Sequence, residues 1–303
     1  MEVIVDYHIP VLLKESIEGL NIDPQGTYVD VTFGGGGHSR QILKKLKTGK
    51  LIAFDKDPDT NPLLISDPRF TFIRHDFKFI KNYLSHLDVV PVNGILADLG
   101  VSSHQFDTRE RGFSYRFDAD LDMRMDPDIE VSAQDIINTY SEEELHRIFG
   151  MYGEIKNAKT LAARIVKARS EAFIKTTSNL VDIINSCVMR GDDRKKYTGQ
   201  VFQALRITVN DELNSLKKLI EAAAEVLIPG GRLVVITYHS LEDRIVKNYI
   251  KAGNFTGKTE TDLYGNLHVP FRQVNRKPFE PSEKEIGENI RARSAKLRIA
   301  EKL

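Results

Sequence analysis

Short runs of apolar, β-branched and aromatic residues recur along the chain and predict strands that are buried on both faces. Five such runs occur, at residues 28–32, 51–54, 70–73, 94–97 and 232–237. Between the earlier runs, residues 39–46 and 78–87 place their apolar side chains on one helical face. Alternation of strand and helix predicts an α/β fold, with a mostly parallel sheet covered by helices on both sides.

The long stretch between residues 99 and 210 breaks this alternation, because it contains no convincing strand. A connection of this length is too long for a loop and is expected to have its own structure. Ser141 and Glu144 have the spacing of a capping box at a helix start, and residues 157–169 continue the helical pattern. We therefore expect a helical insert at residues 106–205, inside a discontinuous domain made of residues 1–105 and 206–303.

Composition places the chain among ordinary globular proteins, with 41% hydrophobic and 28% charged residues. The single cysteine, Cys187, excludes an internal disulfide and favours a reducing compartment. The N-terminal residues include acids and no basic region, which argues against a signal peptide. No apolar run approaches the ~20 residues that a membrane-spanning helix needs. We expect a soluble, cytoplasmic protein.

The formal net charge is zero, but charge is unevenly distributed along the chain. Residues 107–154 hold 13 acids and 5 bases, whereas residues 156–196 hold 10 bases and 4 acids. A local basic face can attract phosphates even when the whole protein is neutral. Solvated helix faces explain the same blocks equally well. Charge alone therefore leaves a nucleic-acid partner open.

The glycine run Gly34–Gly37 leaves the first predicted strand and enters a helix. Glycines permit close approach of a ligand to the backbone and expose amide donors at a helix N-terminus. Asp55 ends the second predicted strand, about 20 residues on, where an acid accepts hydrogen bonds from a ribose diol. A plain tight turn explains the glycines alone, but the combination favours an adenosine-containing ligand.

Residues around the glycine run favour S-adenosylmethionine over a dinucleotide. Ser39 occupies the sixth position, where a dinucleotide-binding loop has glycine. Asp30, just before the loop, suits the amino group of a methionine moiety better than a pyrophosphate. Asp98 ends the fourth predicted strand, where its carboxylate could face a sulfonium cation. Asp76 and Phe77 follow the third strand and could contact adenine, although Phe77 could equally be a core aromatic.

Six segments, taken in order, resemble the signatures of one family. They are HIPVLL at residues 8–13, TFGGGGHS at 32–39, DLGVSS at 98–103, ERGFS at 110–114, LDMRMD at 121–126 and HSLEDRIVK at 239–247. The set is similar to that of the bacterial 16S rRNA (cytosine-N4)-methyltransferases, the MraW or RsmH family. The resemblance extends from about residue 8 to Glu301. It implies a class I (Rossmann-like) methyltransferase fold with a helical insert, and we expect the insert to help recognise rRNA.

The same resemblance implies the cofactor, the substrate and the residues that bind the cofactor. The cofactor is S-adenosylmethionine, and the substrate is a decoding-centre (P-site) cytidine of 16S rRNA in the small ribosomal subunit, methylated on its exocyclic N4. The implied cofactor contacts are Gly36, Gly37, His38, Asp55, Phe77, Asp98 and Gln105. One departure is Ile290, which stands where the family usually has proline and leaves the conformation of the tail open.

The catalytic residues are less clearly marked. Many amino-methylating enzymes carry an Asp/Asn-Pro-Pro-aromatic motif after the fourth strand, and this chain has Asp98-Leu99-Gly100-Val101 there. Asp98 or the hydroxyls of Ser102 and Ser103 are the candidates to polarise the cytosine amine. His239 and Asp243 follow the fifth strand and are either part of a helix start or, as the resemblance favours, active-site residues. We expect Ser240 and Glu242 to cap that helix.

Two further clusters and two other functions have to be weighed. Residues 118–122 are rich in aspartate, but an EF-hand loop needs glycine and glutamate where this chain has Met123 and Ile129. We therefore expect no metal site. A basic stretch either clamps RNA phosphates or lies along a solvated terminal strand edge; it contains Arg291, Arg293, Lys296 and Arg298. The alternative functions are an NAD-dependent oxidoreductase and a non-catalytic RNA-binding assembly factor.

Overall fold

The computed structural model describes residues 10–191, 193–259, 261 and 269–303. The chain divides into two compact units, one made of residues 1–100 with 213–303 and the other of residues 101–212. We refer to them as the sheet unit and the helical unit. The first family-like segment begins at His8 and Ile9, which lie outside the described residues.

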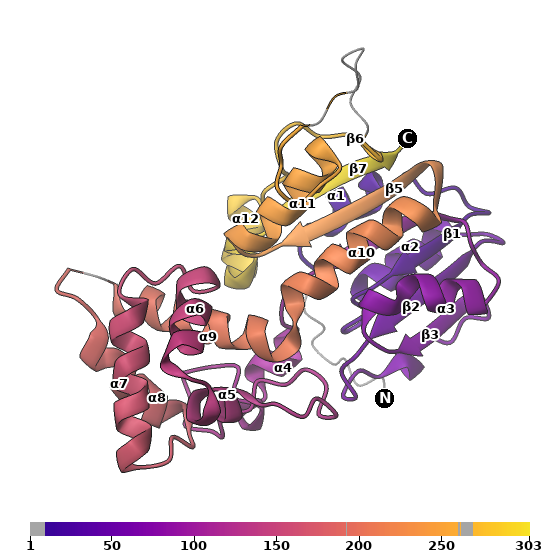
Figure 1. Ribbon diagram of the computed structural model, residues 1–303. Coiled ribbons are helices and arrows are strands. Elements are labelled where there is room, and N and C mark those ends of the chain that lie inside the picture. The colour runs from indigo at the N-terminus through magenta and orange to yellow at the C-terminus, as the bar shows by residue number, and fades with distance from the viewer. Residues whose placement is uncertain (1–9, 192, 260, 262–268) are drawn as a thin grey trace. The chain divides into compact units, whose positions relative to one another are not determined.

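The sheet unit contains a seven-stranded sheet in the order β3-β2-β1-β4-β5-β7-β6 (Figure 1). Strands β1 to β5 are parallel, whereas β7 runs antiparallel to both β5 and β6. All five predicted strands are confirmed, and β6 and β7 were not predicted. The strands are β1 (Thr27–Asp30), β2 (Lys50–Asp55), β3 (Phe70–Arg74), β4 (Val92–Asp98), β5 (Leu227–Thr237), β6 (Phe271–Gln273) and β7 (Lys296–Lys302).

Helices cover both faces of the sheet, so the central strands are apolar on both sides. Leu96 of β4 packs with the helices on one face, whereas its neighbours Ile95 and Ala97 pack on the other. In Figure 1, α3 and α10 lie in front of the sheet, and α1 and α2 lie behind it. The helices are α1 (Leu13–Gly19) and α2 (Gly37–Lys45) on one face, and α3 (Ile80–His86), α10 (Glu212–Val226) and α11 (Ser240–Ala252) on the other.

Strand β7 corrects the expectation for the basic stretch near the C-terminus. It lies between β5 and β6, so it is not a solvated edge of the sheet. Leu297 and Ile299 alternate with the basic residues and are buried in the core. Arg298 is only 7% exposed, which removes it from any phosphate clamp on the surface. Two short helices lie directly before β7: α12 (Glu283–Glu288) and η4 (Ile290–Ser294), and η4 contains Arg291 and Arg293. Two more short turns of helix, η1 (Pro62–Leu64) and η2 (Phe77–Phe79), flank β3.

The helical unit is built from α-helices of 5 to 17 residues, which confirms the helical character predicted from the sequence. The capping box at the start of α6 is confirmed: the Glu144 N–H donates to Ser141 Oγ at 3.2 Å, and the Ser141 N–H donates to Glu144 Oε2 at 2.8 Å. Among the described residues, no helix combines the length and apolar character required to cross a bilayer. The helices are α4 (Ser103–Asp107), η3 (Arg109–Arg111), α5 (Ala133–Thr139), α6 (Glu142–Met151), α7 (Ala158–Glu171), α8 (Thr177–Cys187) and α9 (Arg194–Asn210).

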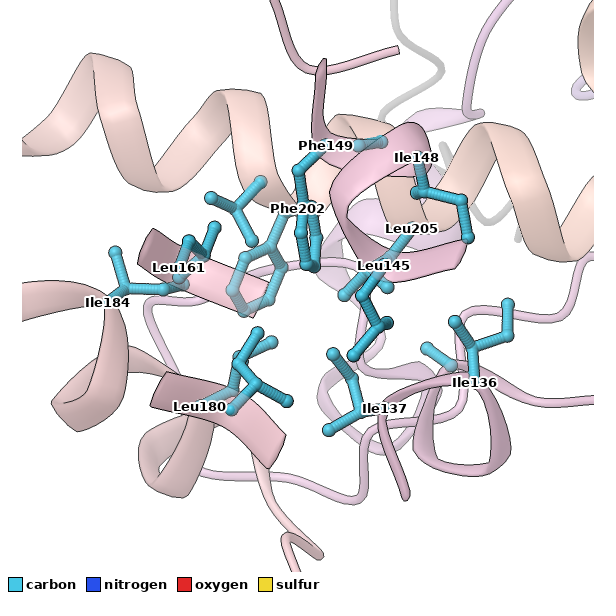
Figure 2. Packing of buried hydrophobic residues seen from close by; sticks show 14 of the residues in the cluster. Ile136, Ile137, Leu145, Ile148, Phe149, Leu161, Leu180, Ile184, Phe202 and Leu205 are labelled. Carbon is cyan, nitrogen blue, oxygen red and sulfur yellow. The ribbon is translucent and has the colours of Figure 1, made fainter. Parts of the chain in front are cut away.

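The helical unit has a hydrophobic core of its own (Figure 2). Leu145 and Phe149 from α6 meet Leu161 from α7, Leu180 from α8 and Phe202 from α9, and each is almost completely buried. Burial of this much apolar side-chain surface is the main source of stability for a helical unit.

A polar network holds the loop around residues 121–126 against α9. Both carboxylate oxygens of Asp122 accept from the Arg124 guanidinium, at 2.9 and 2.7 Å. Asn210, which is 2% exposed, accepts from the Met125 N–H at 2.8 Å and donates to the Met123 carbonyl at 2.8 Å. The family-like segment LDMRMD is therefore a structural loop, and Asp122 is committed to an ion pair within it.

Replacing Asn210 with alanine should destabilise the protein. The Asn210→Ala change leaves a buried N–H and a buried carbonyl without partners, and we expect the free energy of unfolding to fall by about 2–4 kcal/mol. Denaturant titration followed by circular dichroism measures the change. Asn185→Ala, at a partly exposed position within α8, is the matched control and should be nearly neutral. Equal effects of the two substitutions would contradict the assigned network.

Candidate active site

The carboxyl ends of β1, β4 and β5 meet at one edge of the sheet. Asp98 closes β4, and its backbone N–H donates to the Thr32 hydroxyl, which follows β1, at 2.7 Å. The next residue, Leu99, donates its N–H to the Ile236 carbonyl of β5 at 3.0 Å. Open parallel sheets bind ligands at this edge. The loops that follow three adjacent strands are therefore held together around Asp98.

The two oxygens of the Asp98 carboxylate have different surroundings. Its Oδ1 accepts a hydrogen bond from the Tyr238 hydroxyl at 2.7 Å, and its Oδ2 lies 3.8 Å from His38 Nδ1. The side chain remains 22% exposed, so the carboxylate is accessible. Burial raises the pKa of Asp98 to about 7, opposed by the Tyr238 hydrogen bond and assisted by the nearby acids. A carboxyl with this pKa exchanges protons near neutral pH.

His38 lies beside Asp98 as a neutral imidazole. Burial lowers the pKa of His38 to about 4, and a hydrogen bond to the Val11 backbone opposes this shift. The 3.8 Å approach to Asp98 is therefore not an ion pair at neutral pH. His38 Nε2 is buried and has no hydrogen-bond partner among the residues that the structure describes. A buried polar atom without a partner is costly unless a ligand satisfies it.

The glycine run has distinct requirements at each position. Gly34 and Gly36 have φ angles of +50° and +72°, which favour glycine over other residues. A side chain on Gly37 would come within 2.2 Å of Pro10 Cγ, so Gly37 is needed for close packing. A side chain on Gly34 would meet nothing within 4 Å, so the backbone there faces open space. Gly36 is also the N-cap of α2 and, being glycine, provides no side-chain cap for that helix.

Asp30 does not have the role expected from the sequence. It is 0% exposed, and its Oδ2 accepts from the Ser39 hydroxyl at 2.6 Å. Its Oδ1 accepts from the Thr32 N–H at 3.2 Å. Burial raises the pKa of Asp30 to about 6, and these hydrogen bonds oppose the shift. Asp30 therefore braces the glycine loop from inside, and the prediction that it binds the amino group of a ligand was wrong.

Asp55 ties the end of β2 to the glycine loop. Its Oδ2 accepts from the Gly34 N–H at 2.8 Å, and its Oδ1 accepts from the Asp57 N–H at 3.0 Å. Burial raises the pKa of Asp55, whereas these hydrogen bonds and one from Thr60 lower it. A carboxylate offers roughly four acceptor positions. Asp55 therefore retains capacity for one further donor, such as a ribose hydroxyl.

Phe77 begins the turn after β3 and packs as a core aromatic on one side, whereas its contact with adenine stays a prediction. It is half-buried and packs against the core on the α10 face of the sheet, which leaves part of the ring accessible. The preceding Asp76 accepts from the Lys78 N–H at 2.9 Å and lies 3.5 Å from Lys56 Nζ. Asp76 is therefore committed to local structure, and Phe77 is the better candidate for a ring contact.

Three of the predicted site residues belong to the helical unit. Ser102 and Gln105 form a capping box at the start of α4: the Gln105 N–H donates to Ser102 Oγ at 3.1 Å, and the Ser102 N–H donates to Gln105 Oε1 at 3.0 Å. The Ser103 side chain lies outside what the structure describes. The cofactor contact of Gln105 and the catalytic roles of both serines stay predictions.

The start of α11 differs from the expected cap. The N-cap is His239 and not Ser240, because His239 Nδ1 accepts from the Glu242 N–H at 3.4 Å. Glu242 completes the cap, since its Oε2 accepts from the His239 N–H at 3.4 Å, and it also accepts from the Tyr238 N–H at 2.9 Å. Glu242 is 2% exposed. His239 thus has a structural role at the helix start, and its proposed part in catalysis stays a prediction.

Asp243 forms a bidentate ion pair with Arg298. Nε and Nη2 of Arg298 donate to the two Asp243 carboxylate oxygens at 2.7 and 3.0 Å. The side chains are 15% and 8% exposed, so the pair is largely buried. It joins α11 to β7, two segments far apart in the sequence. This arrangement favours an anchoring role for Asp243 over the catalytic role expected from the sequence.

Tyr238 is the site residue that sequence reasoning missed. It follows the last residue of β5 and donates its hydroxyl hydrogen to Asp98. Burial, together with the adjacent Asp98 carboxylate, raises the pKa of Tyr238 well above its ordinary value, so the phenol remains a donor. The sequence did contain a signal for Tyr238: it is an aromatic residue with a hydroxyl, and it follows a predicted strand that is parallel to the strand ending at Asp98. The family-like segment begins one residue later, at His239.

The residues at this edge fit a cofactor with a ribose and a cationic centre. Gly34 presents open backbone, Asp55 keeps an acceptor position, and Asp98 is an accessible carboxylate. His38 adds a buried imidazole nitrogen without a partner. These features agree with the adenosine-containing ligand expected from the sequence.

The Asp243–Arg298 pair provides a test of anchoring against catalysis. Arg298→Met leaves a largely buried carboxylate unpaired, and we expect the free energy of unfolding to fall by roughly 3–5 kcal/mol. The double variant Asp243→Asn/Arg298→Met should recover much of this loss in thermal denaturation. It should also keep methyl transfer, the activity implied by the resemblance, within about threefold of the unmodified protein. A stable but inactive double variant would instead make Asp243 catalytic.

Comparison with known proteins identifies the family of the chain. A family model described as the MraW methylase family matches residues 6–303. The chain is 57% identical over 297 residues to ribosomal RNA small subunit methyltransferase H of Bacteroides thetaiotaomicron, covering 98% of this chain and 97% of that protein. It is 58% identical over 298 residues to the protein of the same name from Cytophaga hutchinsonii, covering 98% and 99%.

Solved structures resemble the chain more distantly. An rRNA methylase from Streptococcus thermophilus aligns with a TM-score of 0.40 at 14% identity, covering 98% of this chain and 99% of that one. A putative methyltransferase from Streptococcus mutans aligns with a TM-score of 0.40 at 15% identity, covering 98% and 100%. The assignment therefore depends on the sequence matches, which span nearly the whole chain. The chain belongs to the MraW methylase family.

Proposed function

We propose that this protein transfers the methyl group of S-adenosylmethionine to the exocyclic N4 of a decoding-centre cytidine in 16S rRNA. The observation that carries the proposal is Asp98, an accessible carboxylate with a pKa near 7 at the ligand-binding edge of the sheet. Full-length similarity to proteins named ribosomal RNA small subunit methyltransferase H supports the rRNA substrate. A ribosomal substrate also makes the cytoplasm the site of the reaction.

The cofactor would be held by residues at the ends of β1, β2 and β4. When bound, S-adenosylmethionine supplies a methyl group on a positively charged sulfur, which leaves as a neutral thioether once the methyl carbon is bonded to N4. Asp55 would accept a ribose hydroxyl, and the open backbone at Gly34 would permit close approach. Gly36, Gly37, Phe77 and Gln105 complete the predicted set, and His38 Nε2 offers a hydrogen bond in its buried position.

Asp98 is the residue that we assign to the amine proton. The cytosine N4 is a weak nucleophile because its lone pair is delocalised into the ring, so a positioned acceptor assists its reaction. Tyr238 occupies Oδ1 and fixes the orientation of the carboxylate, which leaves Oδ2 for the N4 hydrogen. A pKa near 7 allows Asp98 to be ionised before transfer and to take up the proton afterwards. Orientation of the amine supplies the remainder of the rate enhancement.

The helical unit is proposed to recognise the rRNA. Three exposed lysines belong to the basic segment identified in the sequence: Lys156 shortly before α7, and Lys159 and Lys167 within that helix. Exposed cations of this kind contact phosphates without reading the base sequence. The proposed rRNA-recognition domain was expected at residues 106–205, and the compact unit that would perform this role spans residues 101–212.

The Asp98 assignment is tested by methyl transfer to small ribosomal subunits isolated from cells that lack this enzyme. Asp98→Asn keeps the shape of the side chain but removes the charge and the proton acceptor, and we expect turnover to fall by about 10²–10⁴-fold. Asp88→Asn, at an exposed position with a φ of +54° that asparagine tolerates, is the matched control. Near-normal turnover of Asp98→Asn would remove Asp98 from the mechanism.

Calorimetry with the unmodified protein distinguishes the proposed methyltransferase from the two alternatives, an NAD-dependent oxidoreductase and a non-catalytic assembly factor. Binding of S-adenosylmethionine without binding of NADH excludes the oxidoreductase. Binding of S-adenosylmethionine with no transfer to unmethylated small subunits would instead favour a non-catalytic assembly factor that retains the fold.

The dependence of activity on pH should reveal the Asp98–Tyr238 hydrogen bond. We expect kcat/KM for S-adenosylmethionine, which reports on the free enzyme, to rise with pH through an apparent pKa near 7. Tyr238→Phe removes a hydrogen bond that lowers the pKa of Asp98, so the rise should move to higher pH. Tyr83→Phe, a partly exposed tyrosine of α3, serves as the control. An unchanged midpoint in Tyr238→Phe would mean that another group titrates.

A further inference from the structure

A depression at the start of α11 has no part in the mechanism described above. It has a volume of about 310 Å³ and belongs entirely to the sheet unit. It lies where β5 ends and the antiparallel β7 begins, which is the same edge of the sheet as Asp98. Its lining residues are Tyr238, His239, Ser240, Asp243, Ser294 and Lys296.

The lining offers hydrogen-bond donors and positive charge. Ser240 and Ser294 are exposed and present hydroxyls, and Lys296 contributes an ammonium group. The N-terminus of α11, a helix of 13 residues, directs its partial positive charge to the same place. Hydroxyls, an ammonium and a helix N-terminus together are a donor set that suits phosphate oxygens.

His239 provides an independent indication that a ligand binds here. Its side chain is 8% exposed, and its Nδ1 accepts the Glu242 N–H of the helix cap. In a neutral ring that tautomer places the proton on Nε2. Nε2 lies 3.2 Å from Glu242 Oε1, but it makes no hydrogen bond to that oxygen or to any other atom of the described residues. An acceptor in the depression would satisfy this buried donor.

The acidic side chains nearby do not exclude an anion. Asp243 lines the depression, but both of its oxygens accept from Arg298, so its charge is compensated. Glu242 is 2% exposed and is turned to the backbone, where it accepts from the Tyr238 N–H. Glu242 is not among the lining residues, and of the two charged lining residues Asp243 is paired with Arg298, so Lys296 supplies the remaining formal charge of the lining.

We infer that this depression binds a phosphodiester group of the RNA substrate, next to the nucleotide whose base reaches Asp98. Tyr238 connects the two places, because it lines the depression and its hydroxyl holds Asp98. Lys296 and the α11 N-terminus attract the phosphate, and the two serine hydroxyls and His239 donate hydrogen bonds to its oxygens. The inference rests on the proposed function and adds to it a contact that positions the substrate.

The test measures kcat and KM for unmethylated small ribosomal subunits at fixed magnesium. Monovalent salt is varied from about 50 to 200 mM, because affinity that depends on phosphate contacts falls steeply over this range. Lys296→Gln should lower kcat/KM about 5- to 10-fold at low salt, through KM. The slope of log(kcat/KM) against log[salt] should become shallower by about 0.7, as for one lost contact to a single-stranded phosphate. Lys302→Gln, at the other end of β7, is the matched control and should change neither quantity.

A double variant without charge change gives a second measurement. Ser240→Ala/Ser294→Ala removes hydrogen bonds but no charge, so KM should rise while the salt slope stays that of the unmodified protein. Wild-type KM and slope in both variants, with the unmodified protein active, would overturn the phosphate subsite and leave the proposed function standing. Failure of the unmodified protein to methylate the subunits would instead overturn the proposed function.

Discussion

The hydrogen bonds at the end of β4 are the constraint on which the site depends. The Asp98 N–H is bound to the Thr32 hydroxyl after β1, and the Leu99 N–H is bound to the Ile236 carbonyl of β5. These bonds exist because β4 pairs in parallel with both neighbours, so that all three strands end at one edge. They fix Asp98 between the glycine loop on one side and Tyr238 on the other.

Two aspartates at this edge differ in exposure, and this difference separates a structural role from a chemical one. Burial raises the pKa of both Asp30 and Asp98. Asp30 is completely enclosed, and its oxygens are bound to Ser39 and Thr32, so its role is to hold the loop. The pKa of Asp98 is also raised, but its side chain remains 22% exposed, and Tyr238 is hydrogen-bonded to Oδ1 and not to Oδ2. The proposed reaction requires that accessible oxygen.

Local patterns predicted the parts of the fold that local forces determine. The parallel strands are apolar on both faces, and the helices carry apolar stripes, so periodicity was sufficient to find them. Strand β7 was missed because basic residues alternate with its apolar ones, and Arg298 is buried only because Asp243, 55 residues earlier, compensates its charge. Non-local pairs of this kind leave no periodic signal in the sequence.

The same limit applies to the site. Asp55 and Asp98 were found because both end strands that the pattern predicts. Asp30 was misassigned because its partner, Ser39, is placed by the turn of the glycine loop. Tyr238 was missed because its importance depends on a contact with β4, 140 residues away in the sequence. Strand ends could be predicted from the sequence, but partners across the sheet edge could not.

The most direct test of the account is the identity of the methylated nucleoside. Small subunits from cells lacking the enzyme are incubated with the purified protein and isotope-labelled S-adenosylmethionine, and the 16S rRNA is then digested and analysed by mass spectrometry. We expect the label in N4-methylcytidine at a single decoding-centre position, incorporated about 10²–10⁴-fold more slowly by Asp98→Asn. Label on a ring carbon of cytosine, on another base or on the ribose would contradict this expectation.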